Sequence, residues 1–265
     1  MLHGLFCMFM LASWTMILFP FAAGSLLFSP SGAWSLWICR KVWSPVLMWS
    51  GGARLDVRGL EHVDTERPTI YVSNHQSTLD IPALFMAIPV NLRYVAKKML
   101  KAVPFLGWYL HLAGFIFIDR ARHRDALRSL EEAGAQIRSG KSIIMFAEGT
   151  RSDDGSVLPF KKGPFALAEQ ARVAVCPVAI AGSGVIMPKN SWKFTPGVVR
   201  VAIGAPIDPV PFGDDREALL RAVRNAIIDL HLSIGGQGGD KSNAIAAKGR
   251  EGISQRDVPG SSVSP

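Results

Sequence analysis

The chain has 265 residues, enough for one domain with a buried core and a short attachment at either end. Its hydrophobic content is 49% and its formal net charge is +8, so membranes and anionic ligands are both expected. The three cysteines form no CxxC pair, which argues against a disulfide framework or a zinc site. The six histidines form no HExxH motif, and we predict neither a metal nor a cofactor.

Residues 1–50 have the composition of a membrane segment. No Asp, Glu, Lys or Arg occurs from Met1 to Cys39, and the run Leu5–Phe28 is almost continuously apolar. About 20 such residues cross a bilayer as a helix, although Pro20 should interrupt a straight one. The stretch Trp34–Trp49 contains four tryptophans, which concentrate at membrane interfaces. We predict an apolar helical hairpin, or one span followed by an interfacial helix, that attaches the chain to a membrane, in preference to a buried core helix or a signal peptide.

After Gly51 short apolar runs alternate with amphipathic stretches, a rhythm typical of α/β domains. Six strands rich in Ile, Val and Phe are predicted at Thr69–Ser73, Leu92–Ala96, Gly114–Ile118, Ser142–Ala147, Val173–Ala181 and Val198–Ile203. We therefore predict that residues 51–234 form an α/β domain, with a largely parallel or mixed central sheet flanked by helices. Residues 235–265 lack aliphatic periodicity and are predicted to be a disordered tail.

The segment Ser73–Asp80, with the sequence SNHQSTLD, follows the first predicted strand of this domain. If a helix begins near Ser77, His75 lies in the loop and Asp80 in the first turn, from which its carboxylate can bind one imidazole nitrogen. The other nitrogen then faces a substrate, as a general base requires. The alternative is that Ser77 and Asp80 form only a capping box and His75 is a structural loop residue.

The segment Phe146–Ser152, with the sequence FAEGTRS, follows another strong strand. Gly149 permits a tight turn, Thr150 supplies a hydroxyl group, and Arg151 supplies a planar guanidinium that matches phosphate oxygens. The segment is therefore a candidate anion site. A solvated turn with a surface salt bridge is the alternative.

Two further blocks complete the set. Gly114–Arg120 ends in a basic residue just beyond a predicted strand, so Arg120 is another candidate ligand for an anion. Cys176–Ile180 is an apolar strand that either has a structural role or forms one wall of a groove for an acyl chain.

The four blocks, in this order, closely resemble the glycerolipid acyltransferase family, especially bacterial 1-acylglycerol-3-phosphate acyltransferases. The family pattern of His, four residues and Asp falls on His75 and Asp80. Its Gly-x-x-Phe-Ile-Asp-Arg block falls on Gly114–Arg120, and its Phe-Pro-Glu-Gly-Thr-Arg-Ser block on Phe146–Ser152. Ala147 stands in place of the proline, a change that should affect the backbone more than the ligand contacts.

The resemblance implies a set of site residues. His75 and Asp80 are the implied catalytic pair. The residues implied for phosphate or substrate binding are Arg120, Glu148, Gly149, Thr150, Arg151, Lys97 and Lys162. The stretch around Lys97 resembles a family segment that usually has glutamate at the position of Met99, so its local geometry is less well defined by the resemblance.

The implied reaction transfers a fatty acyl group from acyl-CoA or acyl carrier protein to the sn-2 hydroxyl of 1-acyl-sn-glycerol 3-phosphate, giving phosphatidic acid. The implied partners are the lipid bilayer, lysophosphatidic acid and the acyl donor, with no nucleic acid. The implied location is the bacterial inner membrane, with the site facing the cytoplasm. Glycerol 3-phosphate and lyso-ornithine lipid are alternative acceptors.

Two functions from other classes stay open. A serine hydrolase would use His and Asp, but the Gly-x-Ser-x-Gly elbow is missing, since Ala181–Gly184 does not have its spacing. A non-catalytic protein that binds anionic lipid would use the positive charge and the apolar N-terminus equally well, and would not need His75.

Overall fold

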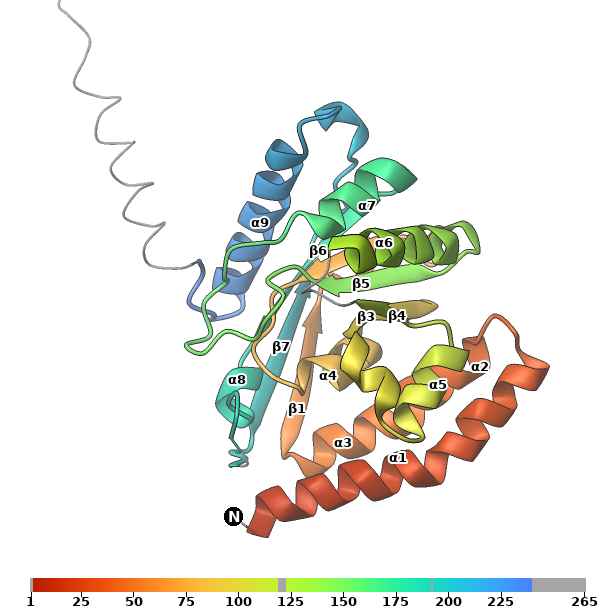
Figure 1. Ribbon diagram of the computed structural model, residues 1–265. Coiled ribbons are helices and arrows are strands. Elements are labelled where there is room, and N and C mark those ends of the chain that lie inside the picture. Colours follow the sequence, from red (N-terminus) through yellow and green to blue (C-terminus); the bar gives the residue numbers. More distant parts are fainter. Residues whose placement is uncertain (1, 119–122, 192, 240–265) are drawn as a thin grey trace, which may run out of the picture.

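A computed structural model describes residues 2–118, 123–191 and 193–239, with the side chains of residues 123–129 left aside (Figure 1). Arg120 and most of the predicted C-terminal tail lie outside the described residues. Within that predicted tail, Gly238 is described, and its backbone N–H donates to His231 Nδ1 (3.1 Å). The ordered chain therefore continues past the predicted end of the domain at residue 234.

A seven-stranded mixed sheet forms the centre of the molecule, with the strand order β1-β7-β6-β2-β5-β3-β4. Strands β6 and β7 are antiparallel, and the other neighbouring pairs are parallel. The strands are β1 (Ala53–Arg58), β2 (Ile70–Ser73), β3 (Leu92–Lys97), β4 (Ile116–Ile118), β5 (Ser142–Phe146), β6 (Val175–Ala181) and β7 (Gly197–Ile203). The predicted fold class is confirmed, and each of the six predicted strands is present.

Strand β1 was missed by the sequence prediction. It lies at the edge of the sheet, pairs only with β7 and alternates apolar residues with Arg54, Asp56 and Arg58. This period of two is typical of a half-buried strand. The prediction relied on apolar runs, which mark strands buried on both faces, so it passed over an edge strand of this kind.

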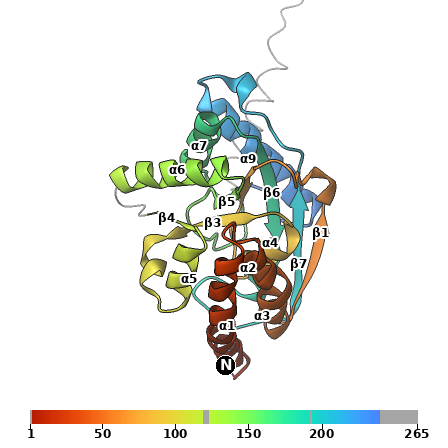
Figure 2. The same ribbon diagram turned by 90° about the vertical axis from the view of Figure 1, so that its right-hand side faces the viewer.

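Helices cover both faces of the sheet (Figures 1 and 2). On one face lie α6 (His123–Arg138), α7 (Gly163–Ala171) and α9 (Arg216–Ser233), which share a core with the sheet. On the other face lie α4 (Asp80–Ala87), α5 (Leu106–Leu112) and the N-terminal helices, which enclose a second core. Short helical turns complete the fold at α8 (Ser183–Ile186), η2 (Leu60–His62), η3 (Lys98–Ala102) and η4 (Val210–Phe212).

The N-terminal residues form an antiparallel helical pair, as the predicted hairpin requires. Helix α1 (Leu2–Phe28) continues through Pro20 and is followed by α2 (Ala33–Ile38), the π-helical turn η1 (Cys39–Trp43) and α3 (Ser44–Ser50). His3 Nε2 lies 2.8 Å from Ser50 O, and Trp43 Nε1 donates to Thr15 Oγ1 (3.0 Å). These bonds join the two arms at their open end and near their middle.

Helix α1 extends along one side of the molecule, away from α6, α7 and α9 (Figure 1). Among the described residues it is the one helix long and apolar enough to cross a membrane, and only 11% of its most apolar 18-residue window is buried. Large apolar side chains such as Phe9 and Phe21 are exposed on it. Exposed apolar surface of this extent is unfavourable in water and indicates contact with lipid.

Arg40 joins the helical pair to the α/β domain. Its guanidinium donates to the carbonyl groups of Phe85 (3.1 Å), Ile88 (3.1 Å) and Val90 (2.6 Å). The first two are at the C-terminal end of α4, where carbonyl groups have no partner within the helix and favour a cation. The N-terminal helices are therefore fixed to the element that begins at Asp80.

Candidate active site

The candidate site lies at the edge of the sheet where β2, β3, β4 and β5 end. These four neighbouring strands are parallel, so their C-terminal ends lie at one edge of the sheet. The loop after β2 contains His75, and the loop after β5 contains Glu148 and Arg151. Two predicted motifs that are about 70 residues apart in the sequence are thereby brought together.

His75 and Asp80 form a direct pair. His75 Nδ1 lies 2.7 Å from Asp80 Oδ2, and the Asp80 side chain is fully buried whereas that of His75 is 16% exposed. Asp80 Oδ2 also accepts from the backbone N–H groups of Gln76 (2.7 Å) and Ser77 (2.9 Å). The carboxylate thus binds both the backbone of the loop and the imidazole, which is more than the capping box of the alternative interpretation requires.

Side chains on either side of His75 hold the loop in place. Asn74 exchanges two hydrogen bonds with the backbone of Ile180: its Nδ2 donates to Ile180 O (2.9 Å), and Ile180 N donates to its Oδ1 (2.8 Å). Ser77 Oγ donates to Met187 O (2.8 Å). Ile180 belongs to the fully buried strand β6, so the structure supports a structural role for the Cys176–Ile180 block.

The imidazole of His75 is stacked on Phe146, the last residue of β5. The ring centroids are 3.8 Å apart and the planes differ by 11°. In addition, Ser152 N donates to His75 O (2.8 Å), so the second loop fixes the backbone of the first. The histidine is therefore confined by its carboxylate partner, by an aromatic ring and by the neighbouring loop.

Arg151 lies beside the histidine loop. Its Nη1 donates to Thr78 Oγ1 (3.2 Å), and Thr78 is located between His75 and Asp80 in the sequence. Gly149 has a φ of 75°, a left-handed conformation that glycine adopts without strain. The turn at Gly149 leaves Thr150 exposed, so a guanidinium and a hydroxyl group are presented at the same edge as His75.

Glu148 is a predicted phosphate ligand whose side chain is buried. Its Oε1 accepts from Leu158 N (3.3 Å). Burial raises the pKa of this carboxyl group to about 8, an effect that the backbone N–H groups of Leu158 and His75 oppose. A buried carboxyl group that accepts from Leu158 supports the loop from below, and its part in phosphate binding stays a prediction.

The two predicted lysines are placed differently from each other. Lys97 is exposed at the C-terminal end of β3, on the same edge of the sheet as His75. Lys162 Nζ pairs with Glu217 Oε2 (2.9 Å) at the start of α9, with both side chains well exposed. This ion pair directs Lys162 toward α9, whereas Lys97 is available to a ligand at the strand ends.

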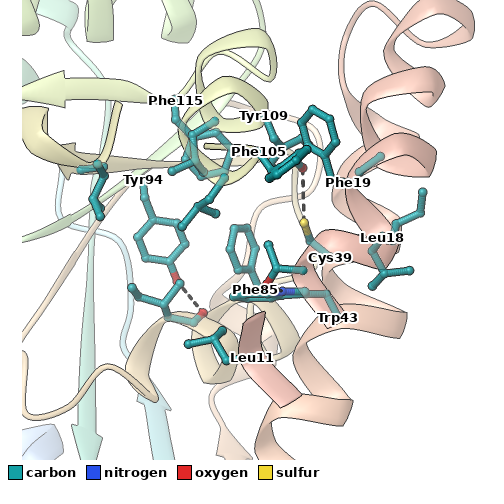
Figure 3. A pocket seen from close by; sticks show the side chains of 18 of the residues that line it. Leu11, Leu18, Phe19, Cys39, Trp43, Phe85, Tyr94, Phe105, Tyr109 and Phe115 are labelled. Carbon is teal, nitrogen blue, oxygen red and sulfur yellow. Dashed lines mark hydrogen bonds between the residues drawn. The ribbon is translucent and has the colours of Figure 1, made fainter. Parts of the chain in front are cut away.

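An apolar pocket of about 250 Å³ begins at the histidine loop (Figure 3). Thr78 and Ile81 line it at that end, and α1, β3 and α5 supply most of its walls, including Phe19, Tyr94 and Phe105. The hydroxyl group of Tyr94 donates to Ile81 O (2.9 Å), so the polar end of this side chain is satisfied. The pocket therefore presents an almost wholly apolar surface beside His75.

Residues 54–181 match the protein family described as Acyltransferase. The chain is 34% identical over 203 residues to the 1-acyl-sn-glycerol-3-phosphate acyltransferase of Saccharomyces cerevisiae, over 75% of this chain and 67% of that protein. The chain belongs to this acyltransferase family. It is also 36% identical over 195 residues to the human 1-acyl-sn-glycerol-3-phosphate acyltransferase alpha, over 71% of this chain and 68% of that protein.

A solved structure agrees with this membership of the acyltransferase family. The crystal structure of the 1-acyl-sn-glycerophosphate (LPA) acyltransferase, PlsC, from Thermotoga maritima matches with a TM-score of 0.72 and 28% identity, covering 97% of each chain. The match thus includes the N-terminal helices as well as the α/β domain. The family and the apolar helix α1 together indicate that this acyltransferase associates with a membrane.

Several residues that support the acyltransferase site were missed by the sequence prediction. Gln76 Nε2 donates to Gly155 O (2.9 Å) and lies 3.0 Å from Nε2 of the buried His231, in α9. Asn74 and Phe146 were noted only as members of their motifs. For Asn74 the signal was present, because a polar side chain at the end of a buried strand must find a backbone partner. For His231, 155 residues away from Gln76, the sequence gave no signal.

Proposed function

We propose that this acyltransferase transfers a fatty acyl group from acyl-CoA or acyl carrier protein to the sn-2 hydroxyl of 1-acyl-sn-glycerol 3-phosphate, giving phosphatidic acid. The single observation that carries the proposal is the His75–Asp80 pair, 2.7 Å apart, in a segment whose Thr78 both accepts from Arg151 and lines an apolar pocket. A base, an anion ligand and a site for an acyl chain are the three elements that this reaction needs.

In the proposed mechanism His75 is the general base. Since Asp80 Oδ2 accepts a hydrogen bond, Nδ1 carries the proton and the lone pair of Nε2 remains for the acceptor hydroxyl group. Nε2 takes the hydroxyl proton as the oxygen attacks the thioester carbonyl carbon. The C–S bond then breaks, and the imidazolium returns the proton to the thiolate. Asp80 stabilises the imidazolium throughout, and no acyl-enzyme intermediate forms.

The phosphate of the acceptor is proposed to bind Arg151 and Lys97, and Arg120, which lies outside the described residues, is retained as a further ligand implied by the family motif. Arg151 is the best supported of these, because its guanidinium contacts Thr78 in the histidine loop. A phosphate held there fixes the distance between the acceptor hydroxyl group and Nε2. Positioning of this kind contributes to the rate as well as to affinity.

The apolar pocket is proposed to receive a fatty acyl chain. It extends from Thr78 and Ile81 toward Phe19 on α1 and Phe105 in front of α5, so a chain inside it has its head near His75. Burial of methylene groups contributes about 0.8 kcal/mol each to binding. We propose that the reaction needs neither a metal nor a cofactor, since a general base and a thioester suffice.

The proposed location is the bacterial inner membrane, with the site facing the cytoplasm. The support is the apolar helix α1 together with three buried free cysteines, Cys7, Cys39 and Cys176, which suit a reducing compartment. Both substrates of the proposed reaction are found there: the acceptor lies in the bilayer, and the thioester donor is in the cytosol.

The decisive experiment offers the purified full chain lysophosphatidic acid, glycerol 3-phosphate and lyso-ornithine lipid side by side, with one labelled acyl-CoA and then with acyl carrier protein. We expect acylation of lysophosphatidic acid, and a rate about 10²–10⁴-fold lower for His75→Ala. The control variant is His62→Ala, since His62 lies outside the site and its ring binds Ile203 O. Equal rates for wild type and His75→Ala would refute the proposal.

The same protein preparation separates the alternatives. A serine hydrolase would react with a fluorophosphonate probe, whereas an acyltransferase that uses His75 as a base has no nucleophilic serine to label. A protein that only binds anionic lipid would give no phosphatidic acid with any donor. Preference for lyso-ornithine lipid would keep the mechanism and change the acceptor.

A further inference from the structure

A second apolar surface lies outside the N-terminal helices, on the segment Lys97–Leu112, which we name the η3–α5 segment. Three of its large apolar side chains are strongly exposed: Met99 (72%), Trp108 (53%) and Leu112 (62%). The segment lies in the middle of the catalytic domain, between β3 and β4. Exposure of this many large apolar groups over so short a stretch is unusual for a surface in water and marks a contact surface.

The charge around this surface has one sign. From Ile81 to Ile118 the sequence contains no Asp or Glu, whereas the η3–α5 segment contains Lys97, Lys98 and Lys101, all exposed. Long lysine side chains can place their stems on apolar surface and their ammonium groups in a polar layer. Apolar groups bordered by cations and lacking acids are complementary to a bilayer with anionic headgroups.

The η3–α5 segment is continuous with the apolar side of α1. The Phe19 ring of α1 packs against Phe105 (centroids 5.3 Å apart) and Trp108 (6.4 Å). In Figure 1, α1 and α5 lie next to each other, on the side of the molecule opposite α7 and α9. Both elements also line the apolar pocket (Figure 3). A bilayer that receives the exposed side of α1 therefore meets the η3–α5 segment as well.

We propose that the η3–α5 segment is a second membrane-contact element, which inserts Met99, Trp108 and Leu112 into one leaflet and binds anionic lipid headgroups through its lysines. The occupant of this surface is a lipid bilayer and not a second copy of the chain. The contact holds the α/β domain against the lipid at a point distant from the open end of the hairpin, and so fixes its orientation. This inference concerns membrane geometry and is independent of the acyl-transfer reaction.

The test measures the depth of individual side chains in lipid. The native cysteines Cys7, Cys39 and Cys176 are buried, so a nitroxide label reacts selectively with a cysteine introduced on the surface of the full chain. The labelled variants are Met99→Cys and Leu112→Cys. Val210→Cys is the matched control, because Val210 is equally exposed (63%) but lies in η4, beside α9.

In phosphatidylglycerol vesicles we expect the labels at positions 99 and 112 to be relaxed by oxygen more than by a water-soluble nickel complex, at a depth of ~5–10 Å. The label at position 210 should be relaxed by the nickel complex more than by oxygen. Equal aqueous accessibility at all three positions would overturn the proposal. Dipolar broadening between labels without lipid contact would also overturn it, in favour of self-association. Neither outcome depends on acyl transfer.

A second arm tests the headgroup contact. Lys101→Glu, introduced into the Met99→Cys protein, should move the label toward water in phosphatidylglycerol vesicles and leave it unchanged in phosphatidylcholine vesicles. Each lysine near an anionic surface favours binding about 5-fold, so the charge reversal should weaken insertion of the segment about 30-fold. Arg221→Glu, an exposed change on α9, is the control. If Lys101→Glu left the label depth unchanged in both kinds of vesicle, the role of the lysines would be refuted.

Discussion

The two loops that form the site are each held by a buried carboxyl group, but the two groups have different surroundings. The loop after β2 is held by Asp80, the first residue of α4, whose Oδ2 accepts from His75 Nδ1 and from two backbone N–H groups at 2.7–2.9 Å. In the loop after β5, Glu148 Oε1 accepts from Leu158 N at 3.3 Å, and its Oε2, like Asp80 Oδ1, has no partner within the described part of the chain.

The difference lies in the number and proximity of hydrogen-bond donors and not in burial, which is almost complete for both residues. Short hydrogen bonds from several donors fix Asp80 Oδ2 in place, so this carboxyl group orients the imidazole. Glu148 lacks such a set of donors, and burial raises its pKa to about 8. The first loop therefore uses its carboxyl group for chemistry, whereas the second uses its carboxyl group for support and presents Arg151 to the ligand.

The largest expected effect comes from removing the charge of the first loop. Asp80→Asn removes the negative charge at the point where three donors converge on Oδ2, so the imidazolium loses its stabilising charge. We expect kcat to fall about 10²–10⁴-fold, close to the effect of His75→Ala. The double variant should be no worse than either single variant, because the pair acts as a unit. If the losses of kcat in the two single variants added up in the double variant, the two residues would act independently, which would contradict the prediction.

Arg151→Ala tests the ligand role of the second loop. We expect kcat/KM for lysophosphatidic acid to fall about 10–10²-fold, through loss of a charge-assisted contact worth ~1.5–3 kcal/mol. Arg151→Lys should retain part of the activity, since the charge remains and the planar fork does not. Arg221→Ala on α9 is the control. A loss of the same size with an unphosphorylated monoacylglycerol would remove Arg151 from the phosphate site.

Glu148→Gln sharpens the contrast between the two carboxyl groups. Because the pKa of Glu148 is raised to about 8 in the folded protein, the folded state holds a proton between pH 4.5 and 8 that the unfolded chain has released. Wild-type stability should therefore fall as pH rises through this range, by up to ~1.4 kcal/mol per pH unit from this group. The glutamine variant lacks this component. The measurement is the difference in Tm between the two proteins from pH 5 to 8, and a constant difference would contradict the prediction.

The smallest expected effect concerns the apolar pocket, which Thr78 of the first loop helps to line. Ala96 lines this pocket from β3, and Ala96→Leu reduces its volume. We expect the preferred donor to shorten by about two to four methylene groups, since each buried methylene contributes about 0.8 kcal/mol. Competition between acyl-CoA donors of several lengths measures the change. An unaltered preference would place the acyl chain elsewhere.

The fold and the core of the site could be predicted because their signals are local. The Ser73–Asp80 motif places a histidine and its carboxylate within one turn of chain, and apolar runs such as Ser142–Phe146 mark central strands. Strand β1 was missed because it is a half-buried edge strand. The inward orientation of Glu148 depends on Leu158, which follows the turn, and sequence spacing alone does not define that turn.

The proposed membrane contact of the η3–α5 segment also could not be predicted from sequence spacing alone. The prediction placed membrane contact within residues 1–50, where uncharged residues are continuous. The η3–α5 segment has only short apolar runs interrupted by lysines, and its exposure becomes apparent only when β3 and β4 place it beside α1. Contacts such as Gln76 with His231 are similarly set by tertiary packing.

Helix α4 has Asp80 at its first position, and the carbonyl groups at its other end accept from Arg40 of the N-terminal helices. One short rigid rod thus connects the anchor in the lipid to the carboxylate that aligns the base. The geometry of the base is therefore coupled to the placement of the N-terminal helices through one helix of eight residues.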